Sequence, residues 1–223
     1  MNLQENKNLI FEQVALAAEA ANRSKNSVNV IAVTKYVDSE TAKKLVDTGI
    51  EHIGENRVDK FLDKYEALKD QQLTWHLIGS LQRRKVKSVI NFVDYFHALD
   101  SVKLAAEIQK RAERPVKCFL QVNISEEESK HGFKVTEVEE AIAEIANFDK
   151  VIVVGLMTMA PIDASQDEID TIFARTNQLR RQLQDRKIKN MPLTELSMGM
   201  SGDYQIAIKN GSTFVRIGTS FFK

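Results

Sequence analysis

Short apolar runs rich in β-branched residues recur about eight times along this chain, and a charged segment with helical periodicity follows nearly every one. The runs occupy residues 28–34, 51–54, 74–79, 93–97, 116–124, 151–157, 193–198 and 213–217. Runs that are apolar throughout, instead of alternating with polar positions, are typical of parallel strands covered on both faces. The pattern therefore restricts the chain to α/β architectures.

Helices are predicted in the intervening segments, at residues 39–48, 57–69, 83–91, 101–114, 136–147, 166–187 and 202–210. Asp38 or Ser39 and Ser101 stand at the starts of two of them as expected N-caps, and Thr136 with Glu139 has the spacing of a capping box. These start signals agree with the strand–helix alternation.

About eight strand–helix units predict a single closed (β/α)₈ barrel of the TIM type, formed as one domain by residues 1–223. An amphipathic pattern over residues 3–22 predicts one additional helix before the first strand. The alternative is an open doubly wound sheet. It is less favoured because no early glycine-rich phosphate loop follows the first strand.

Charge balance argues against binding to nucleic acid through phosphate neutralisation, because 31 Lys and Arg residues face 31 Asp and Glu residues. The basic run at residues 83–87 is interpreted as a solvated helix face. An interaction or nucleic-acid surface there is the alternative.

Several features predict a cytoplasmic protein that does not span a membrane. The first residues lack a secretory signal pattern, and no apolar run approaches the ~20 residues that a spanning helix needs. The single cysteine, Cys118, cannot form an internal disulfide and is expected to be a small buried hydrophobic residue.

Lys35 directly follows the first apolar run and is the first candidate for chemistry. In barrels of this type functional groups lie at the carboxyl ends of the strands. An apolar stem behind a lysine favours the neutral amine that attacks carbonyl carbons, which is Schiff-base chemistry. A solvated lysine closing a strand is the alternative. Asn56 and Ser80 follow the second and third runs and offer uncharged hydrogen-bonding groups.

Three histidines, His52, His76 and His97, lie in or at the end of the apolar runs and are interpreted as satisfied core residues. His131 is interpreted as a loop residue. No spacing of His, Cys or Asp resembles a metal site, so no metal is expected.

The last two strand ends predict a phosphate site, because such sites in barrels are commonly built from these loops and a helix N-terminus. Hydroxyl donors and glycines with room for an approaching oxygen gather there: Ser197, Ser201, Thr219, Gly199, Gly202 and Gly218. Ser201 acting only as an N-cap is the alternative.

Arg216 is expected to project into the mouth of the barrel if its neighbours Val215 and Ile217 face the helices. A fixed cation there suits a heterocyclic nitrogen that stays unprotonated. Together with Lys35 and the phosphate site, this predicts a phosphorylated aldehyde or ketone, such as a pyridoxal ring. An arginine bridging acidic side chains is the alternative.

Six stretches of the chain then match one known family in order, at residues 32–35, 54–56, 75–79, 155–157, 197–201 and 215–219. The chain resembles the pyridoxal phosphate (PLP) homeostasis proteins, which are single-domain relatives of the alanine racemase N-terminal barrel. The resemblance implies that Lys35 forms the internal aldimine with PLP. It assigns the other contacts as follows: Ser201, Gly218 and Thr219 to the phosphate, Ser197 and Met198 to the same wall, Arg216 to the pyridine nitrogen, and Asn56 to the ring substituents.

The resemblance also implies a protein that buffers PLP, or delivers it to PLP-dependent apo-enzymes, without an established turnover reaction and without catalytic residues. A monomer is expected, because the second domain of the dimeric racemases has no counterpart in these 223 residues. A PLP-dependent amino-acid racemase is the alternative function. Its nearest candidate base in the sequence is Tyr36, which strand alternation would point away from Lys35.

Overall fold

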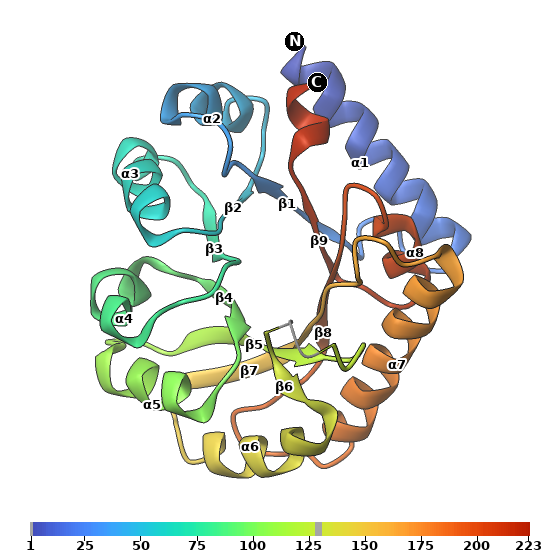
Figure 1. The fold of residues 1–223 in the computed structure, drawn as a ribbon. Coiled ribbons are helices and arrows are strands. Elements are labelled where there is room, and N and C mark those ends of the chain that lie inside the picture. The colour runs from blue at the N-terminus through green and yellow to red at the C-terminus, as the bar shows by residue number, and fades with distance from the viewer. Residues whose placement is uncertain (1, 128–130) are drawn as a thin grey trace.

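The computed structural model describes residues 2–127 and 131–223, and it consists of a closed parallel barrel surrounded by helices (Figure 1). The eight barrel strands are β1 Asn29–Val33, β2 His52–Glu55, β3 Thr74–Leu77, β4 Tyr95–Leu99, β5 Val116–Asn123, β7 Val151–Met157, β8 Glu195–Met200 and β9 Phe214–Ile217. Each strand pairs in parallel with the next, and β9 pairs with β1 to close the ring. The predicted eight-stranded barrel is confirmed.

Helices alternate with the strands along the chain and form the outer layer. They are α1 Leu3–Ala20, α2 Ser39–Val46, α3 Val58–Leu68, α4 Arg83–Val89, α5 Val102–Arg111, α6 Val138–Ile145, α7 Gln166–Gln184 and α8 Tyr204–Lys209, with short 3₁₀ turns η1 Ile90–Phe92, η2 Val135–Glu137 and η3 Thr219–Phe222. None of the helices described is both long and apolar enough to span a membrane.

Two of the three predicted helix starts are confirmed. The Asp38 carboxylate accepts a hydrogen bond from the third backbone N–H of α2, and the Ser101 hydroxyl does the same for α5. The capping box at Thr136 is wrong, because the chain there forms η2 and the Glu137 carboxylate accepts instead from the backbone N–H of Lys134. The short strand β6, Phe133–Lys134, which pairs with the end of β5, was not predicted.

The predicted N-terminal helix α1 covers the part of the barrel that the last strand leaves without a following helix. Only η3 follows β9, and α1 lies beside β9 and α8, which brings the two ends of the chain together (Figure 1). Its buried residues Ile10, Val14 and Ala18 pack in one cluster with outward-facing residues of β1 and β9, such as Val30 and Val215. Without α1 this apolar strand surface would face water.

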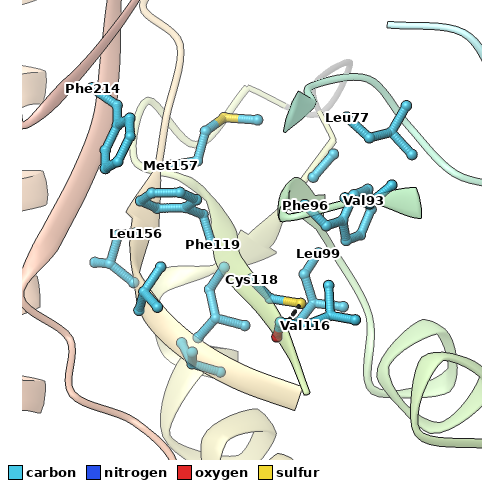
Figure 2. Packing of buried hydrophobic residues seen from close by; sticks show 14 of the residues in the cluster. Leu77, Val93, Phe96, Leu99, Val116, Cys118, Phe119, Leu156, Met157 and Phe214 are labelled. Carbon is cyan, nitrogen blue, oxygen red and sulfur yellow. Dashed lines mark hydrogen bonds between the residues drawn. The ribbon is translucent and has the colours of Figure 1, made fainter. Parts of the chain in front are cut away.

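The larger hydrophobic cluster joins the strands to the remaining helices. Figure 2 shows Cys118 among Leu99 and Val116, with Phe119 beside Leu156 nearby. Cys118 is fully buried as predicted, and burial raises the pKa of its thiol. The basic run at residues 83–87 lies on α4 with its Arg and Lys side chains exposed, which agrees with a solvated helix face.

Candidate functional site

A cavity of about 700 Å³ opens at the carboxyl-terminal end of the barrel. Its walls come from the ends of β1, β2, β3, β5, β8 and β9 and from the segment after β7: Val33, Lys35, Tyr36, Asn56, Ile78, Gly79, Ser80, Gln121, Val122, Asn123, His131, Met159, Ala160, Ile162, Met200, Ser201, Gly202, Arg216, Gly218 and Thr219. Its position is the one expected for the functional end of such a barrel.

Six of the eight residues predicted for the site line this cavity, namely Lys35, Asn56, Ser201, Arg216, Gly218 and Thr219. Ser197 and Met198 are fully buried and do not line it. Side chains on a strand alternate in direction, so two consecutive residues of β8 cannot share one wall. Ser197 lies inside the barrel against Arg216, whereas Met198 packs in the hydrophobic cluster around the barrel.

Lys35 lies in the turn after β1 with an exposed side chain, so the desolvation expected from the sequence is not present. Its Nζ atom lies 4.9 Å from the centre of the Tyr36 ring. The prediction that Tyr36 points away from Lys35 is wrong. β1 ends at Val33, so strand alternation no longer applies to these two residues, and both side chains reach the cavity.

Arg216 lies buried in the cavity wall. Its Nη1 atom donates a hydrogen bond to the Ser197 hydroxyl at 2.6 Å, and Nη2 donates to the Thr158 carbonyl at 3.2 Å. Val215 and Ile217 pack outward with α1 and α8, as predicted. No carboxylate in residues 2–127 or 131–223 lies within ion-pair distance of Arg216. Burial lowers the pKa of the guanidinium to about 10, and Asp203 counteracts this in part.

The side of the cavity predicted to hold phosphate consists of two turns. Ser201 and Gly202 lie in the turn between β8 and α8, and Thr219 begins η3 after Gly218. A Cβ atom added at Gly202 would meet nothing within 4 Å, so this side stays open. Gly199 does not line the cavity. It has φ +94°, and a Cβ there would lie 2.6 Å from Ala207, so it allows α8 to pack close to β8.

A buried ion pair lies directly behind Lys35 and Asn56. The Glu55 Oε1 atom accepts from the Thr34 hydroxyl at 2.6 Å and from Lys64 Nζ, on α3, at 2.7 Å. All three side chains are almost completely buried, and Glu55 Oε2 has no hydrogen-bond partner. Since Thr34 precedes Lys35 and Glu55 precedes Asn56, the hydrogen bond between Thr34 and Glu55 joins the two strand ends that carry them, and the ion pair holds β2 against α3.

The three strand histidines are satisfied by one another rather than by separate partners. His76 is fully buried and lies within hydrogen-bond distance of both His52 and His97. His97 in turn contacts the Ser197 hydroxyl. His131 lies in a loop, as predicted, and lines the cavity. No group of His, Cys, Asp or Glu with metal-site geometry occurs among the residues described.

Comparison with known proteins places this barrel in a family. The family model for the N-terminal domain of alanine racemase matches residues 12–223. The pyridoxal phosphate homeostasis protein of Aquifex aeolicus is 39% identical over 225 aligned residues, which cover 100% of this chain and 98% of that protein. The chain belongs to the pyridoxal phosphate homeostasis protein family.

Two solved structures agree with the membership of this chain in the family. A protein from Bifidobacterium adolescentis is 32% identical, with a TM-score of 0.94, over 99% of this chain and 94% of its own. PipY of Synechococcus elongatus PCC7942, with PLP bound, is also 32% identical, with a TM-score of 0.84, over 94% of this chain and 100% of its own. The predicted family is confirmed.

Several residues that line the cavity were not predicted from the sequence. Gln121 and Asn123 are polar residues two positions apart at the end of β5, and that spacing could have placed both on the inner face. Met159 and Ile162 lie in the segment between β7 and α7. Their residue types carry no signal that would have found them.

Buried histidines should make this family member less stable as the pH falls below neutral. Burial lowers the pKa of His76 and His97 well below the ordinary value, and neighbouring cationic groups add to the effect. The unfolded chain takes up protons at these positions below about pH 6.5, whereas the folded chain does not. Their contribution is therefore fully present above pH 6.5 and is lost as the pH falls toward the folded pKa values.

We expect the free energy of unfolding to fall by about 2–3 kcal/mol between pH 7.5 and 5.5, from two rings at about 1.4 kcal/mol per pH unit each. Urea unfolding at several pH values measures this. Asp100 and Asp203, whose pKa burial raises, act in the opposite direction, and an Asp100→Asn, Asp203→Asn variant removes them. A flat profile in that variant would contradict the prediction.

Proposed function

We propose that this chain binds PLP in the cavity, holds it reversibly on Lys35, and releases it to other proteins without turning over a substrate. One observation carries the proposal. The Lys35 amine and the buried Arg216 guanidinium line the same cavity, and Arg216 forms no ion pair with a carboxylate among the described residues. The PLP-bound structure of PipY, which matches most of this chain, supports the choice of ligand.

The residues that line the cavity match each chemical group of PLP. Ser201, Gly202 and Thr219 would bind the phosphate through hydroxyl and backbone donors. Arg216 stays protonated and would therefore face an unprotonated pyridine nitrogen, which makes the ring a weaker electron sink than a carboxylate partner would. Asn56 would contact the ring substituents. A volume of about 700 Å³ lies in the usual range for small-molecule sites, roughly 300–1,000 Å³.

The PLP aldehyde supplies an electrophilic carbon, to which the Lys35 amine can attach as a C=N bond with loss of one water molecule. The exposed position of Lys35 lets water or a second amine reach this bond and reverse it. A site built for turnover would instead exclude water. Reversible attachment in an open site therefore suits a carrier better than an enzyme.

Exposed apolar side chains surround the mouth of the cavity. We call Tyr36, Met159, Ile162 and Met200 the apolar rim; all four line the cavity, and Ile162 is 98% exposed. Exposed apolar groups gathered at a binding site are typical of protein contact surfaces. The proposed recipients are PLP-dependent apo-enzymes, which would approach this rim. The carrier would act as a monomer in the cytoplasm.

Transfer of PLP to an apo-enzyme tests this function. Loaded, gel-filtered protein is mixed with an apo-aminotransferase, and recovery of aminotransferase activity is followed. We expect recovery close to that given by an equal amount of free PLP, with loss of the carrier's visible absorbance at the same rate. No recovery, with the absorbance retained, would contradict release to other proteins.

A racemase is the second candidate, and the contact of Tyr36 with Lys35 favours it, because a tyrosine beside the attachment point is a candidate base. Its ring is largely exposed, however, and a base must come within about 3 Å of the proton it removes. The loaded protein is incubated with single amino acids in deuterium oxide. Exchange at the α-carbon would support the racemase, and its absence would support the carrier.

A further inference from the structure

A chain of hydrogen bonds runs through the barrel from its amino-terminal end to the cavity. His52 Nδ1 lies 2.9 Å from His76 Nε2, and His76 Nδ1 lies 2.9 Å from His97 Nε2. His97 Nδ1 lies 2.8 Å from the Ser197 Oγ atom, which also accepts from Arg216. The three histidines lie on the neighbouring strands β2, β3 and β4, and the step to Ser197 crosses the barrel to β8. We call His52, His76, His97 and Ser197 the histidine relay.

Aromatic rings pack against the relay and fix the orientation of its rings. Tyr95 stacks on His76 with an interplanar angle of 10° and a centroid distance of 4.9 Å. Phe119 stacks on His97 at 27° and 4.4 Å. Phe214 contacts all three histidines. Because the rings cannot swing away, a change in the relay must occur through proton positions rather than through side-chain rotation.

The ends of the relay determine the direction of its hydrogen bonds. Arg216 can only donate a hydrogen bond, so the Ser197 oxygen accepts from it. The Ser197 hydroxyl can still donate one hydrogen bond to another group. His97 Nδ1 lies within hydrogen-bond distance and can accept, so the Ser197 hydroxyl donates to it. His97 then carries its proton on Nε2 and donates to His76, which donates from Nε2 to His52. All three neutral rings are thus Nε2–H tautomers.

Protonation of His52 would reverse this direction. A protonated His52 donates from Nδ1, so His76 must accept on Nε2. His76 and then His97 each lose the proton on Nε2 and gain one on Nδ1, so the net change in the relay is the one proton that His52 gains. His97 then donates to Ser197, and the Ser197 hydroxyl is released to a new acceptor beside Arg216. The charged groups that face the relay are Glu51 and Asp94 at His52, Lys117 at His76, and Arg216 at His97, with Asp203 facing Arg216.

We propose that His52, His76 and His97 are positioning residues that couple a proton at the amino-terminal end of the barrel to Ser197 and, through Ser197, to Arg216, which lines the cavity. His52 is the partly exposed member of the relay, and its protonation state sets the direction of the hydrogen bonds. The coupling to a ligand rests on the proposed function, but the tautomers do not.

The first test uses the ligand-free protein. Nitrogen-15 correlation spectra of the imidazole rings report the tautomer of each of the four histidines, and the exposed His131 is an internal control. We expect Nε2–H rings at positions 52, 76 and 97 at pH 7.5. As His52 takes up a proton, His76 and His97 should switch to Nδ1–H with the same midpoint, independently of His131. An Nδ1–H ring at position 76 or 97 at pH 7.5 would overturn the proposal.

A variant separates proton coupling from packing. In His52→Gln the carboxamide can still accept from His76 but cannot take up a proton. His76 and His97 should keep the Nε2–H form at every pH at which the variant is folded. A switch at the wild-type midpoint would show that the histidines respond to another group, and would contradict the relay.

PLP is then added to the wild-type protein. A ligand that brings negative charge and new acceptors beside Arg216 favours the reversed relay. It should therefore raise the pKa of His52 by about half a unit, and PLP should bind roughly threefold more tightly with His52 protonated, because the coupling is reciprocal. If PLP did not bind, the proposed function would be wrong, and the relay would be tested by the tautomers of the ligand-free protein alone. PLP binding with an unchanged His52 would overturn the coupling.

Discussion

Lys35→Ala is expected to abolish the visible absorbance that PLP gains on binding to this protein. Among the cavity side chains that the structure describes, Lys35 supplies the primary amine, so its removal leaves none of them able to form the C=N bond. The ligand should still bind weakly through Arg216, Ser201 and Thr219, with the spectrum of the free aldehyde. Visible spectra of apo-protein titrated with PLP measure both effects.

Lys60→Ala is the matched control for this prediction. Lys60 is an exposed lysine on α3 that does not line the cavity, so the variant removes the same charge without touching the site. Its spectrum should equal that of the wild type. If Lys35→Ala kept the visible band, the attachment point would lie elsewhere in the chain and the assignment of Lys35 would be wrong.

Lys64→Met is expected to destabilise the fold by about 3–5 kcal/mol, the usual cost of breaking a buried ion pair by removing one partner. The Glu55 carboxylate is completely buried and already has one oxygen without a partner, so the loss of Lys64 leaves an uncompensated charge. Urea unfolding of the apo-protein measures the change. PLP affinity should fall as well, because Thr34 and Glu55 fix the strand ends beside Lys35 and Asn56.

Two further variants distinguish this prediction from a general effect of losing a lysine. Lys44→Met breaks an exposed pair with Glu40 on α2, and it should leave the unfolding curve almost unchanged. In Glu55→Leu, Lys64→Met both charges are absent, and most of the stability should return because no buried charge remains. A double variant as unstable as Lys64→Met would show that packing, not charge, dominates.

The fold was largely predictable because strand burial on both faces leaves a strong sequence signal. All eight barrel strands overlap the predicted apolar runs, and α1 was expected from its periodicity. The failures are local. The residues around Thr136 formed a 3₁₀ turn whose cap comes from Glu137, and β6 is only two residues long, too short for any periodicity.

The placement of Lys35 and Arg216 at the cavity was predictable, because each lies at or near the end of a strand. The site was not predictable where the role depends on neighbours in space. His52, His76 and His97 were interpreted singly, and only the register of β2, β3 and β4 brings their rings together. Met198 was misplaced because the expectation ignored alternation along β8, which points Ser197 inward and Met198 outward.

Borohydride reduction of the PLP-loaded wild-type protein, followed by peptide mass mapping, tests the central claim most directly. Reduction converts a C=N bond into a stable C–N bond and so labels the lysine that carries the ligand. We expect one reduced pyridoxyl-phosphate group per chain, on the peptide that contains Lys35. A label on another lysine, or no label from a protein that has bound PLP, would contradict the claim.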